Sequence, residues 1–248
     1  MTAPAIIFAG PTLPPAIRPA EDATFAWRPP VRQGELYRAA LARPAAIGIV
    51  DGYFEVTPTV WHKEILWAMA EGIPVYGAAS IGALRAAELD VFGMRGIGRV
   101  YEAYRDRELE DDDEVAVLHG PEELGYPLLT EAMVDIRATL AEASRVGVID
   151  TTPAARLTKV AKELFYKDRT YRAILDAAAV AGLPAAALRA LADWLPSGRI
   201  DQKRRDAEAM LAAIHAQLAA RSPPPCVTWR LAETAAWHAA REDAERGF

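Results

Sequence analysis

Residues 45–89 contain two consecutive units in which a short apolar run ends in small or polar residues and a helical segment follows. The first unit covers residues 46–72 and the second covers residues 73–89. Parallel strands need crossover connections of this kind, so the pattern predicts an open, mostly parallel, Rossmann-like α/β sheet. In such sheets reactive groups collect where strands end and helices begin. Asp51 and Ser80 follow the two apolar runs, so we expect both at that edge of the sheet.

Further elements extend this pattern on both sides. The run Ala5–Gly10 predicts a buried first strand, and residues 34–41 have the spacing of a helix. Residues 115–118 predict a fourth strand. Beyond residue 150 the chain is rich in alanine, and proline and glycine separate its helical segments. We therefore expect an α/β core domain over residues 1–150 and an all-helical C-terminal domain or cap over residues 151–248.

Composition and charge exclude several classes of protein. The net charge of -6 and the pI near 5.4 lack the basic footprint of a nucleic-acid-binding protein. Cys226 is the single cysteine, so neither an internal disulfide nor a cysteine zinc cluster is expected. No apolar run reaches the roughly 18 residues of a membrane helix, and the start lacks a secretory signal, so we expect a soluble cytoplasmic protein. No Walker or dinucleotide fingerprint occurs, and no cofactor or resident metal is predicted.

The segment Ala78-x-Ser80-x-Gly82 has the form of a nucleophile elbow in which alanine replaces the usual first glycine. Small flanking residues let a strand turn sharply into a helix while the serine points outward. Backbone N–H groups at the start of that helix can hold an oxyanion. The alternative is structural, because serine is also a common helix N-cap. The sequence leaves both roles of Ser80 open.

Two histidines are candidates for a general base beside Ser80. His119 follows the predicted fourth strand, which places it at the same kind of strand end as Ser80. Thr57 and Pro58 predict the N-cap and first residue of a helix, which puts His62 in its second turn. Each histidine can equally be a structural residue on an apolar face.

Polar residues near the same edge are candidates for substrate binding. Gly10 and Thr12 follow the first strand and can approach a phosphate or oxyanion, with a plain strand-ending turn as the alternative. Arg85 and Glu88 are three residues apart on one helix face, so they pair with each other or Arg85 binds a carboxylate. The acidic run 108–114 is typical of a solvated loop, with magnesium binding by its aspartates as the alternative.

Five stretches and one further residue form one set: Phe8–Leu13, Gly48–Phe54, Trp61–Leu66, Gly77–Leu89, Asp112–Val117 and His119. Together they resemble the TfuA family over most of residues 5–145, and the long middle stretch is the most specific. The resemblance implies work beside a YcaO enzyme in the biosynthesis of ribosomal peptide natural products. YcaO enzymes activate a peptide amide with ATP and, with TfuA-like help, replace its carbonyl oxygen by sulfur. TfuA-like proteins are thought to assist sulfur delivery from a thiocarboxylated ThiS-like carrier protein, or to activate YcaO.

The residues and the resemblance combine in one hypothesis for catalysis. Ser80 attacks the thiocarboxylate of the carrier, hydrosulfide is expelled close to YcaO, and water releases the carrier as a carboxylate. A histidine takes the serine proton, an acid orients that histidine, and N–H groups near Ile81 hold the oxyanion. The predicted catalytic residues are Ser80, His119, His62, Asp51 and Glu64, with Glu88 as a further acid for orienting a histidine. The predicted substrate-binding residues are Gly10, Thr12, Arg85 and Glu88.

Two other functions are compatible with the same residues. A non-catalytic adaptor would bind YcaO with this face and bias its conformation. A metal-assisted hydrolase would use His62, His119 and the acidic run. The sequence leaves the peptide substrate, the sulfur donor and the oligomeric state open, and it is compatible with a homo-oligomer.

Overall fold

The computed structural model describes residues 3–19, 23–220 and 227–246, so Cys226 lies outside the described residues. The chain forms two compact units. Met1–Glu110 and Arg204–Phe248 make the first unit, and Asp111–Lys203 make the second. These units do not coincide with the expected division at residue 150, because the chain returns to the first unit at Arg204. In the described part of the chain, no helix is long and apolar enough to cross a membrane.

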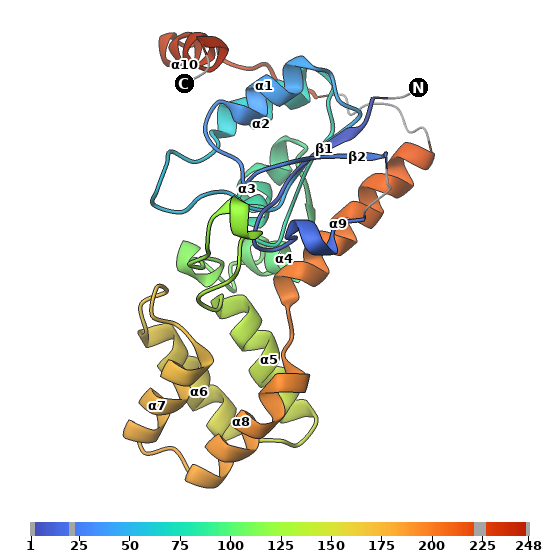
Figure 1. Ribbon diagram of the computed structural model, residues 1–248. Coiled ribbons are helices and arrows are strands. Elements are labelled where there is room, and N and C mark those ends of the chain that lie inside the picture. The colour runs from blue at the N-terminus through green and yellow to red at the C-terminus, as the bar shows by residue number, and fades with distance from the viewer. Residues whose placement is uncertain (1–2, 20–22, 221–226, 247–248) are drawn as a thin grey trace. The chain divides into compact units, whose positions relative to one another are not determined.

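A five-stranded, all-parallel sheet forms the centre of the first unit and confirms the predicted α/β class (Figure 1). The strand order is β2-β1-β3-β4-β5. Gly48 in β3 pairs with Ile7 on one side and with Tyr76 on the other, so the three predicted strands of this region lie in the middle of the sheet. The strands are β1 (Ala5–Phe8), β2 (Phe25–Arg28), β3 (Ile47–Ile49), β4 (Val75–Ala78) and β5 (Arg95–Ile97).

The edges of the sheet differ from what the sequence predicts. β2 lies within a proline-rich stretch and β5 has the sequence Arg-Gly-Ile, so neither is the continuous apolar run that indicates a buried strand. The predicted fourth strand at residues 115–118 is wrong, because these residues form no strand. Val115 and Ala116 are nevertheless apolar and buried, and they belong to the second unit.

Helices cover the two faces of the sheet. The first unit contains α1 (Glu35–Leu41), α2 (His62–Ala70), α3 (Ile81–Leu89), α4 (Arg99–Arg105), most of α9 (Gln202–Ala219) and α10 (Ala235–Arg246). Ile6 and Phe8 of β1 face α1, whereas Ile7 faces α9, as alternation along a strand requires. On the outer side of α1, the ring of Trp237 from α10 packs edge-on against Tyr37 with centroids 5.7 Å apart.

Helix α9 covers a sheet face that the chain before it leaves open. The described residues between β1 and β2 contain only the short 3-10 turn η1 (Pro15–Ile17), so that crossover provides little cover. Met210 and Ile214 of α9 pack there, and Gly48 makes room for them. A Cβ at Gly48 would lie 2.9 Å from Met210 Cε and 3.2 Å from Ile214 Cδ1.

The second unit is helical. Its helices are α5 (Met133–Arg145), α6 (Thr151–Glu163), α7 (Tyr171–Val180) and α8 (Ala185–Gly198). Their apolar stripes meet in one core that includes Ile136, Leu140, Leu157, Ile174 and Leu191. The predicted helical character of this part of the chain is therefore confirmed, and its core begins at α5 rather than after residue 150.

Part of the acidic run is held in an ion-pair network and not in solvent. Glu114 is buried and accepts two hydrogen bonds from Arg137, both 2.9 Å long. Arg169 is fully buried and donates to Asp113 Oδ2 at 2.7 Å, and Lys162 pairs with both acids. The solvated-loop prediction is therefore wrong for Asp113 and Glu114.

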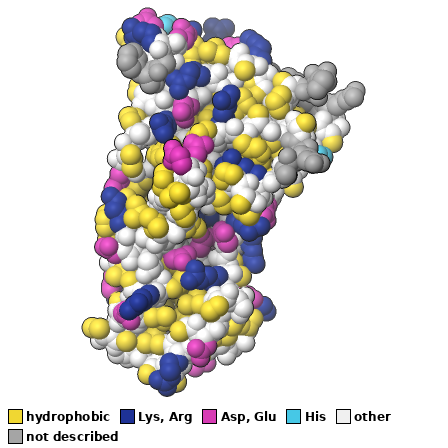
Figure 2. Space-filling view, in the orientation of Figure 1, with side chains coloured by type: hydrophobic (Ala, Val, Ile, Leu, Met, Phe, Trp, Pro, Cys, Tyr) yellow, Lys and Arg dark blue, Asp and Glu magenta, His cyan; other side chains and the backbone are white. Residues whose placement is uncertain are grey.

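Over the face seen in Figure 2, the described basic side chains are interspersed with acidic ones.

Asp135 gives the second unit a predicted dependence on pH. Burial and the nearby Asp201 raise the pKa of Asp135 from 3.8 to about 7, against the opposing effect of Lys203, whose N–H donates to the Asp135 carboxylate at 3.0 Å. The folded chain therefore binds an additional proton between about pH 4 and pH 7. Relative to an Asp135→Asn variant, the wild-type protein should lose stability as the pH rises through this range.

Urea unfolding of both proteins across the range measures the effect. Asp176→Asn removes an exposed carboxylate of the same unit and is the matched control. A stability difference between wild type and Asp135→Asn that does not change with pH would contradict the prediction.

Candidate functional site

The strand order reverses between β1 and β3, and the carboxyl ends of these two neighbouring strands define a candidate site. In sheets with the order 2-1-3-4-5, ligands bind beyond the carboxyl ends of the strands at this switch point. Gly10 and Thr12 follow β1, Asp51 follows β3, and Ser80 follows β4. Four of the residues predicted from the sequence therefore lie along one edge of the sheet.

Asp51 is buried and binds the loop that follows β1. Its Oδ2 accepts the N–H groups of Gly10 at 2.9 Å and Thr12 at 3.0 Å, and its Oδ1 accepts the Thr12 hydroxyl at 2.6 Å. These donors are therefore engaged by Asp51 and are not directed at a ligand. Asp51 holds the loop and contacts neither histidine in the described structure, so it does not orient one.

We expect Asp51→Asn to destabilise the protein by about 2–3 kcal/mol. Hydrogen bonds to a charged acceptor contribute about 1.5–3 kcal/mol each, and the amide can accept from one side only. The amide N–H₂ would also face backbone donors. Urea unfolding measures the loss, and Asp176→Asn, which changes an exposed carboxylate, should stay within about 0.5 kcal/mol of wild type. Equal stability of the two variants would show that this network is unimportant.

The turn between β4 and α3 presents Ser80. Ala79 is completely buried and has φ +67°, a left-handed conformation that is uncommon for a residue with a side chain. Ser80 occupies the N-cap position of α3, but its side chain makes no capping hydrogen bond. Ser80 is half-buried, and its hydroxyl bonds to no described residue. The Ser80 hydroxyl therefore does not cap the helix, which was the structural alternative to a functional role.

Close packing against the sheet brings the start of α3 beside the residues that follow β3. The N–H of Gly82 donates to the carbonyl oxygen of Val50 at 3.3 Å. A Cβ at Gly82 would lie 1.8 Å from the Ile49 carbonyl oxygen, and a Cβ at Gly52 would lie 2.9 Å from Ile81 Cγ2. The N–H of Ile81 donates to no described acceptor, so it is available beside the Ser80 hydroxyl.

His62 is paired with an acid on α3. Its Nε2 lies 2.8 Å from Glu88 Oε2, and Arg85 donates to the same oxygen at 2.7 Å. Burial opposes ionisation of Glu88, but the hydrogen bonds from His62 and Arg85 outweigh it and lower the pKa of Glu88. Arg85 also donates to the Val60 carbonyl at 3.2 Å, a contact that the sequence does not reveal. The predicted Arg85–Glu88 pair is confirmed, and Glu88 is the acid that contacts this histidine.

His62 lies farther from Ser80 than the hypothesis for catalysis requires. Glu88 follows Ser80 by eight positions along α3, which corresponds to a rise of about 12 Å. No hydrogen bond joins the described Ser80 hydroxyl to His62. The Thr57–Pro58 helix start is also wrong, because α2 begins at His62 itself.

Glu64 explains where α2 begins. This buried carboxylate accepts the N–H of Trp61 at 3.0 Å and the N–H of Tyr37 at 3.2 Å. Burial raises the pKa of Glu64, against the opposing effect of these backbone donors and that of Gly34. Glu64 therefore joins the starts of α1 and α2, and it does not orient a histidine in the described structure.

His119 belongs to the second unit. Residues 118–120 and 127–129 form a short antiparallel hairpin in which His119 lies opposite Leu128. The Nδ1 of His119 lies 2.7 Å from the Gly120 carbonyl oxygen, and its ring packs edge-on against Tyr126 at 5.7 Å. Its expected place at the end of a sheet strand is therefore wrong, because there is no strand at 115–118.

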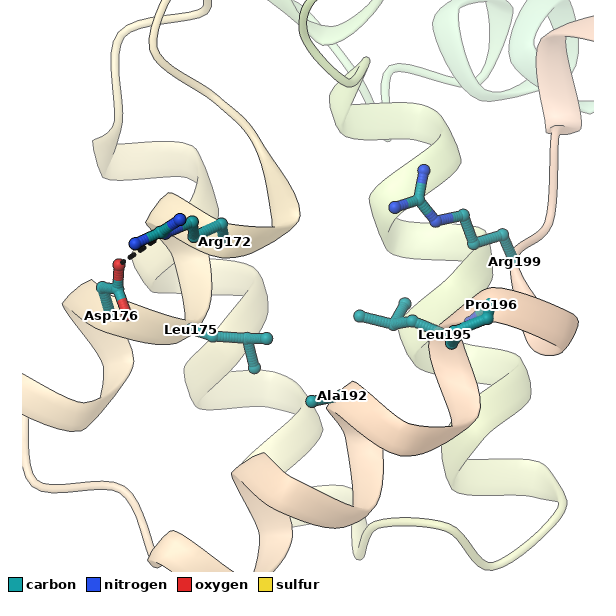
Figure 3. Close-up of a pocket in the computed structure, with 7 residues that line it drawn as sticks. All are labelled: Arg172, Leu175, Asp176, Ala192, Leu195, Pro196 and Arg199. Carbon is teal, nitrogen blue, oxygen red and sulfur yellow. Dashed lines mark ion pairs between the residues drawn. The ribbon is translucent and has the colours of Figure 1, made fainter.

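Other possible sites lie away from these residues. Among the residues that the structure describes, no three His, Cys, Asp or Glu side chains are arranged to hold a metal ion. A cavity of about 550 Å³ lies between α7 and α8 in the second unit (Figure 3). Arg172, Asp176 and Arg199 surround it, and none of the residues predicted for catalysis or substrate binding lines it.

Comparison with known proteins relates the chain to one family. A family model described as "TfuA-like protein" matches residues 51–170. The match includes Asp51, His62, Ser80 and His119, whereas Gly10 and Thr12 precede it. A search of curated proteins gives no match.

Proposed function

Because this chain belongs to the TfuA-like family, we propose that it works beside a YcaO enzyme in peptide backbone thioamidation. Its part is to release sulfur from a thiocarboxylated ThiS-like carrier protein in the cytoplasm, during the biosynthesis of a ribosomal peptide natural product. The observation that carries the proposal is the Ser80 turn. At the start of α3, a serine hydroxyl that caps no N–H lies next to the Ile81 N–H, which has no described acceptor, and near the switch point of the sheet.

The proposed reaction has two steps. In the first step the Ser80 oxygen attacks the thiocarboxylate carbon, an ester forms, and the carbon–sulfur bond breaks to expel hydrosulfide. In the second step water attacks the ester and releases the carrier with a terminal carboxylate. The sum of the steps consumes one water and converts a thiocarboxylate into a carboxylate, hydrosulfide and a proton.

The serine proton has a chemical destination even though no histidine bonds to Ser80. The thiocarboxylate sulfur carries the negative charge and leaves as hydrosulfide, so it can take the proton that serine loses. The His62–Glu88 pair lies about 12 Å along α3 from Ser80, so it is not placed to activate the water for the later attack, and no base is assigned to that step.

Two further groups support the proposed chemistry. The N–H of Ile81 is placed to stabilise the oxyanion that forms when Ser80 attacks. Arg85 provides a positive charge on the same helix, with its side chain mostly buried and fixed by Glu88 and the Val60 carbonyl. We propose that Arg85 attracts the anionic end of the carrier.

Reconstitution tests this function. Purified carrier with a C-terminal thiocarboxylate is incubated with the chain, and free sulfide is measured alongside the mass of the carrier. We expect sulfide release and a carrier mass that changes by the exchange of sulfur for oxygen. Addition of a YcaO enzyme, its peptide and ATP should then give thioamide.

The same experiment distinguishes sulfide release by this chain from a non-catalytic adaptor function. If the chain releases no sulfide from the carrier but still stimulates YcaO supplied with free sulfide, hydrolysis is rejected and the adaptor function is supported. If it does neither, the partnership with YcaO is rejected as well.

A further inference from the structure

The hairpin of residues 118–129, here called the leucine hairpin, exposes an unusual amount of apolar surface. Leu118 is 38% exposed, Leu124 72%, Leu128 50% and Leu129 56%. Isolated surface leucines are ordinary, but four in one short hairpin indicate a surface that another molecule covers.

The geometry of the leucine hairpin makes its tip a projecting knob. Leu129 N–H donates to the Leu118 carbonyl at 2.9 Å, and Gly120 N–H donates to the Pro127 carbonyl at 2.8 Å. Between these bonds the chain forms the 3-10 turn η4 (Glu122–Leu124), whose three residues are all exposed. The tip therefore carries one apolar side chain beside two carboxylates. The leucine hairpin contains no lysine or arginine.

The cavity between α7 and α8 combines an apolar lining with two arginines and one aspartate, Arg172, Arg199 and Asp176. Leu175, Ala192, Leu195 and Pro196 line it with apolar surface. Arg172 of α7 lies at its edge and is turned towards Asp176, and Arg199, which follows α8, lies on the other side (Figure 3). Arg172 is 93% exposed at its side chain and lies 3.8 Å from Asp176. Arg199 is fixed by Glu131 at 2.8 Å and by the ring of Tyr171. A volume of about 550 Å³ exceeds what one leucine side chain fills, which leaves space for acidic neighbours.

The two features complement each other in shape and charge. We propose that the leucine hairpin of one copy of this chain docks into the α7–α8 cavity of a second copy. Leu124 enters the apolar cavity, while Glu122 and Glu123 face the arginines at its rim. Since every copy carries both the knob and the cavity, two copies can make the contact twice around a two-fold axis and form a closed dimer.

The oligomeric state of the full chain tests this proposal. Sedimentation velocity over a range of concentrations should show a dimer for the wild-type protein. Leu124→Ser should raise the dissociation constant at least about tenfold, because the knob loses its apolar anchor. Val146→Ser changes an exposed apolar residue in the same unit outside both surfaces and should leave the dissociation constant unchanged. Circular dichroism and urea unfolding of each variant check that it is folded.

Exchanged charges give a sharper test. A variant with Glu122→Lys and Glu123→Lys places positive charge opposite the arginines, and Arg172→Glu places negative charge opposite the glutamates. Each variant alone should be monomeric. An equimolar mixture should form a heterodimer, because both contacts in it again join opposite charges.

Three results would overturn the proposal. They are a wild-type chain that stays monomeric at every concentration, variants that dimerise as the wild type does, and a mixture of the exchanged variants that stays monomeric. A monomeric chain whose binding to purified YcaO is lost in Leu124→Ser would assign the leucine hairpin to that partner instead. The dimer is independent of sulfide release, so Ser80→Ala should dimerise normally.

Discussion

The Ser80→Ala variant should release sulfide from a thiocarboxylated carrier about 10³-fold more slowly than the wild-type protein, or slower still. Removal of a serine nucleophile in other hydrolases costs at least this much, because the covalent route is lost. The Ile81 N–H and the carrier-binding surface are retained, so a residual rate above the uncatalysed one is expected. Sulfide release under single-turnover conditions measures the effect.

The structure also predicts how this variant differs from a merely unfolded one. The Ser80 hydroxyl caps no N–H and bonds to no described residue, so its removal should change the free energy of unfolding by less than about 0.5 kcal/mol. Ser197→Ala is the matched control, since that hydroxyl bonds only weakly to the Trp194 carbonyl at 3.3 Å in the other unit. Sulfide release at the wild-type rate by Ser80→Ala would rule out Ser80 as the nucleophile.

The largest loss of stability is expected for Gly82→Ala. The new Cβ would lie 1.8 Å from the Ile49 carbonyl oxygen and 2.6 Å from its carbon. Backbone atoms in the middle of a sheet cannot move aside as a flexible side chain does, so α3 would have to shift away from β3. Overpacking in a core costs about 1–3 kcal/mol, and we expect the upper end or more here.

A second glycine provides the comparison. Gly147 has φ +77°, and a Cβ added to it would meet no atom within 4 Å, so Gly147→Ala should cost only the about 1–2 kcal/mol of left-handed strain. Urea unfolding of both variants measures the difference. If Gly82→Ala were the milder of the two, the close approach of α3 to β3 would not be important for stability. A folded Gly82→Ala protein should also release sulfide more slowly, because the Ser80 turn would be displaced.

The sequence predicts the centre of the sheet well because its strands there are buried on both faces. β1, β3 and β4 are continuous apolar runs, and α3 follows directly where small residues permit a sharp turn. The edge strands have no such signal, since one side of an edge strand makes no sheet contact. Residues 115–118 gave the opposite error, because a short apolar run outside any strand has the same composition as a strand.

The candidate site is predicted in part. Strand ends correctly place Asp51, Thr12 and Ser80 along one edge, because parallel strands all end there. Side-chain partners depend on distances that spacing does not encode. Asp51 binds the Gly10–Thr12 loop, Glu64 joins two helix starts, and Glu88 pairs with His62. The left-handed Ala79 has no signature in the sequence, because alanine is common in every kind of segment.

The sheet has a consequence for how the protein is made. Residues 1–110 supply all five strands, but the helix that covers the Ile7 face is built from residues synthesised about a hundred positions later. During translation that apolar face stays open until α9 has left the ribosome, and exposed apolar surface of this kind invites aggregation or chaperone binding. A nascent chain stalled before residue 202 should therefore be a chaperone substrate, whereas one stalled after α9 has emerged should not.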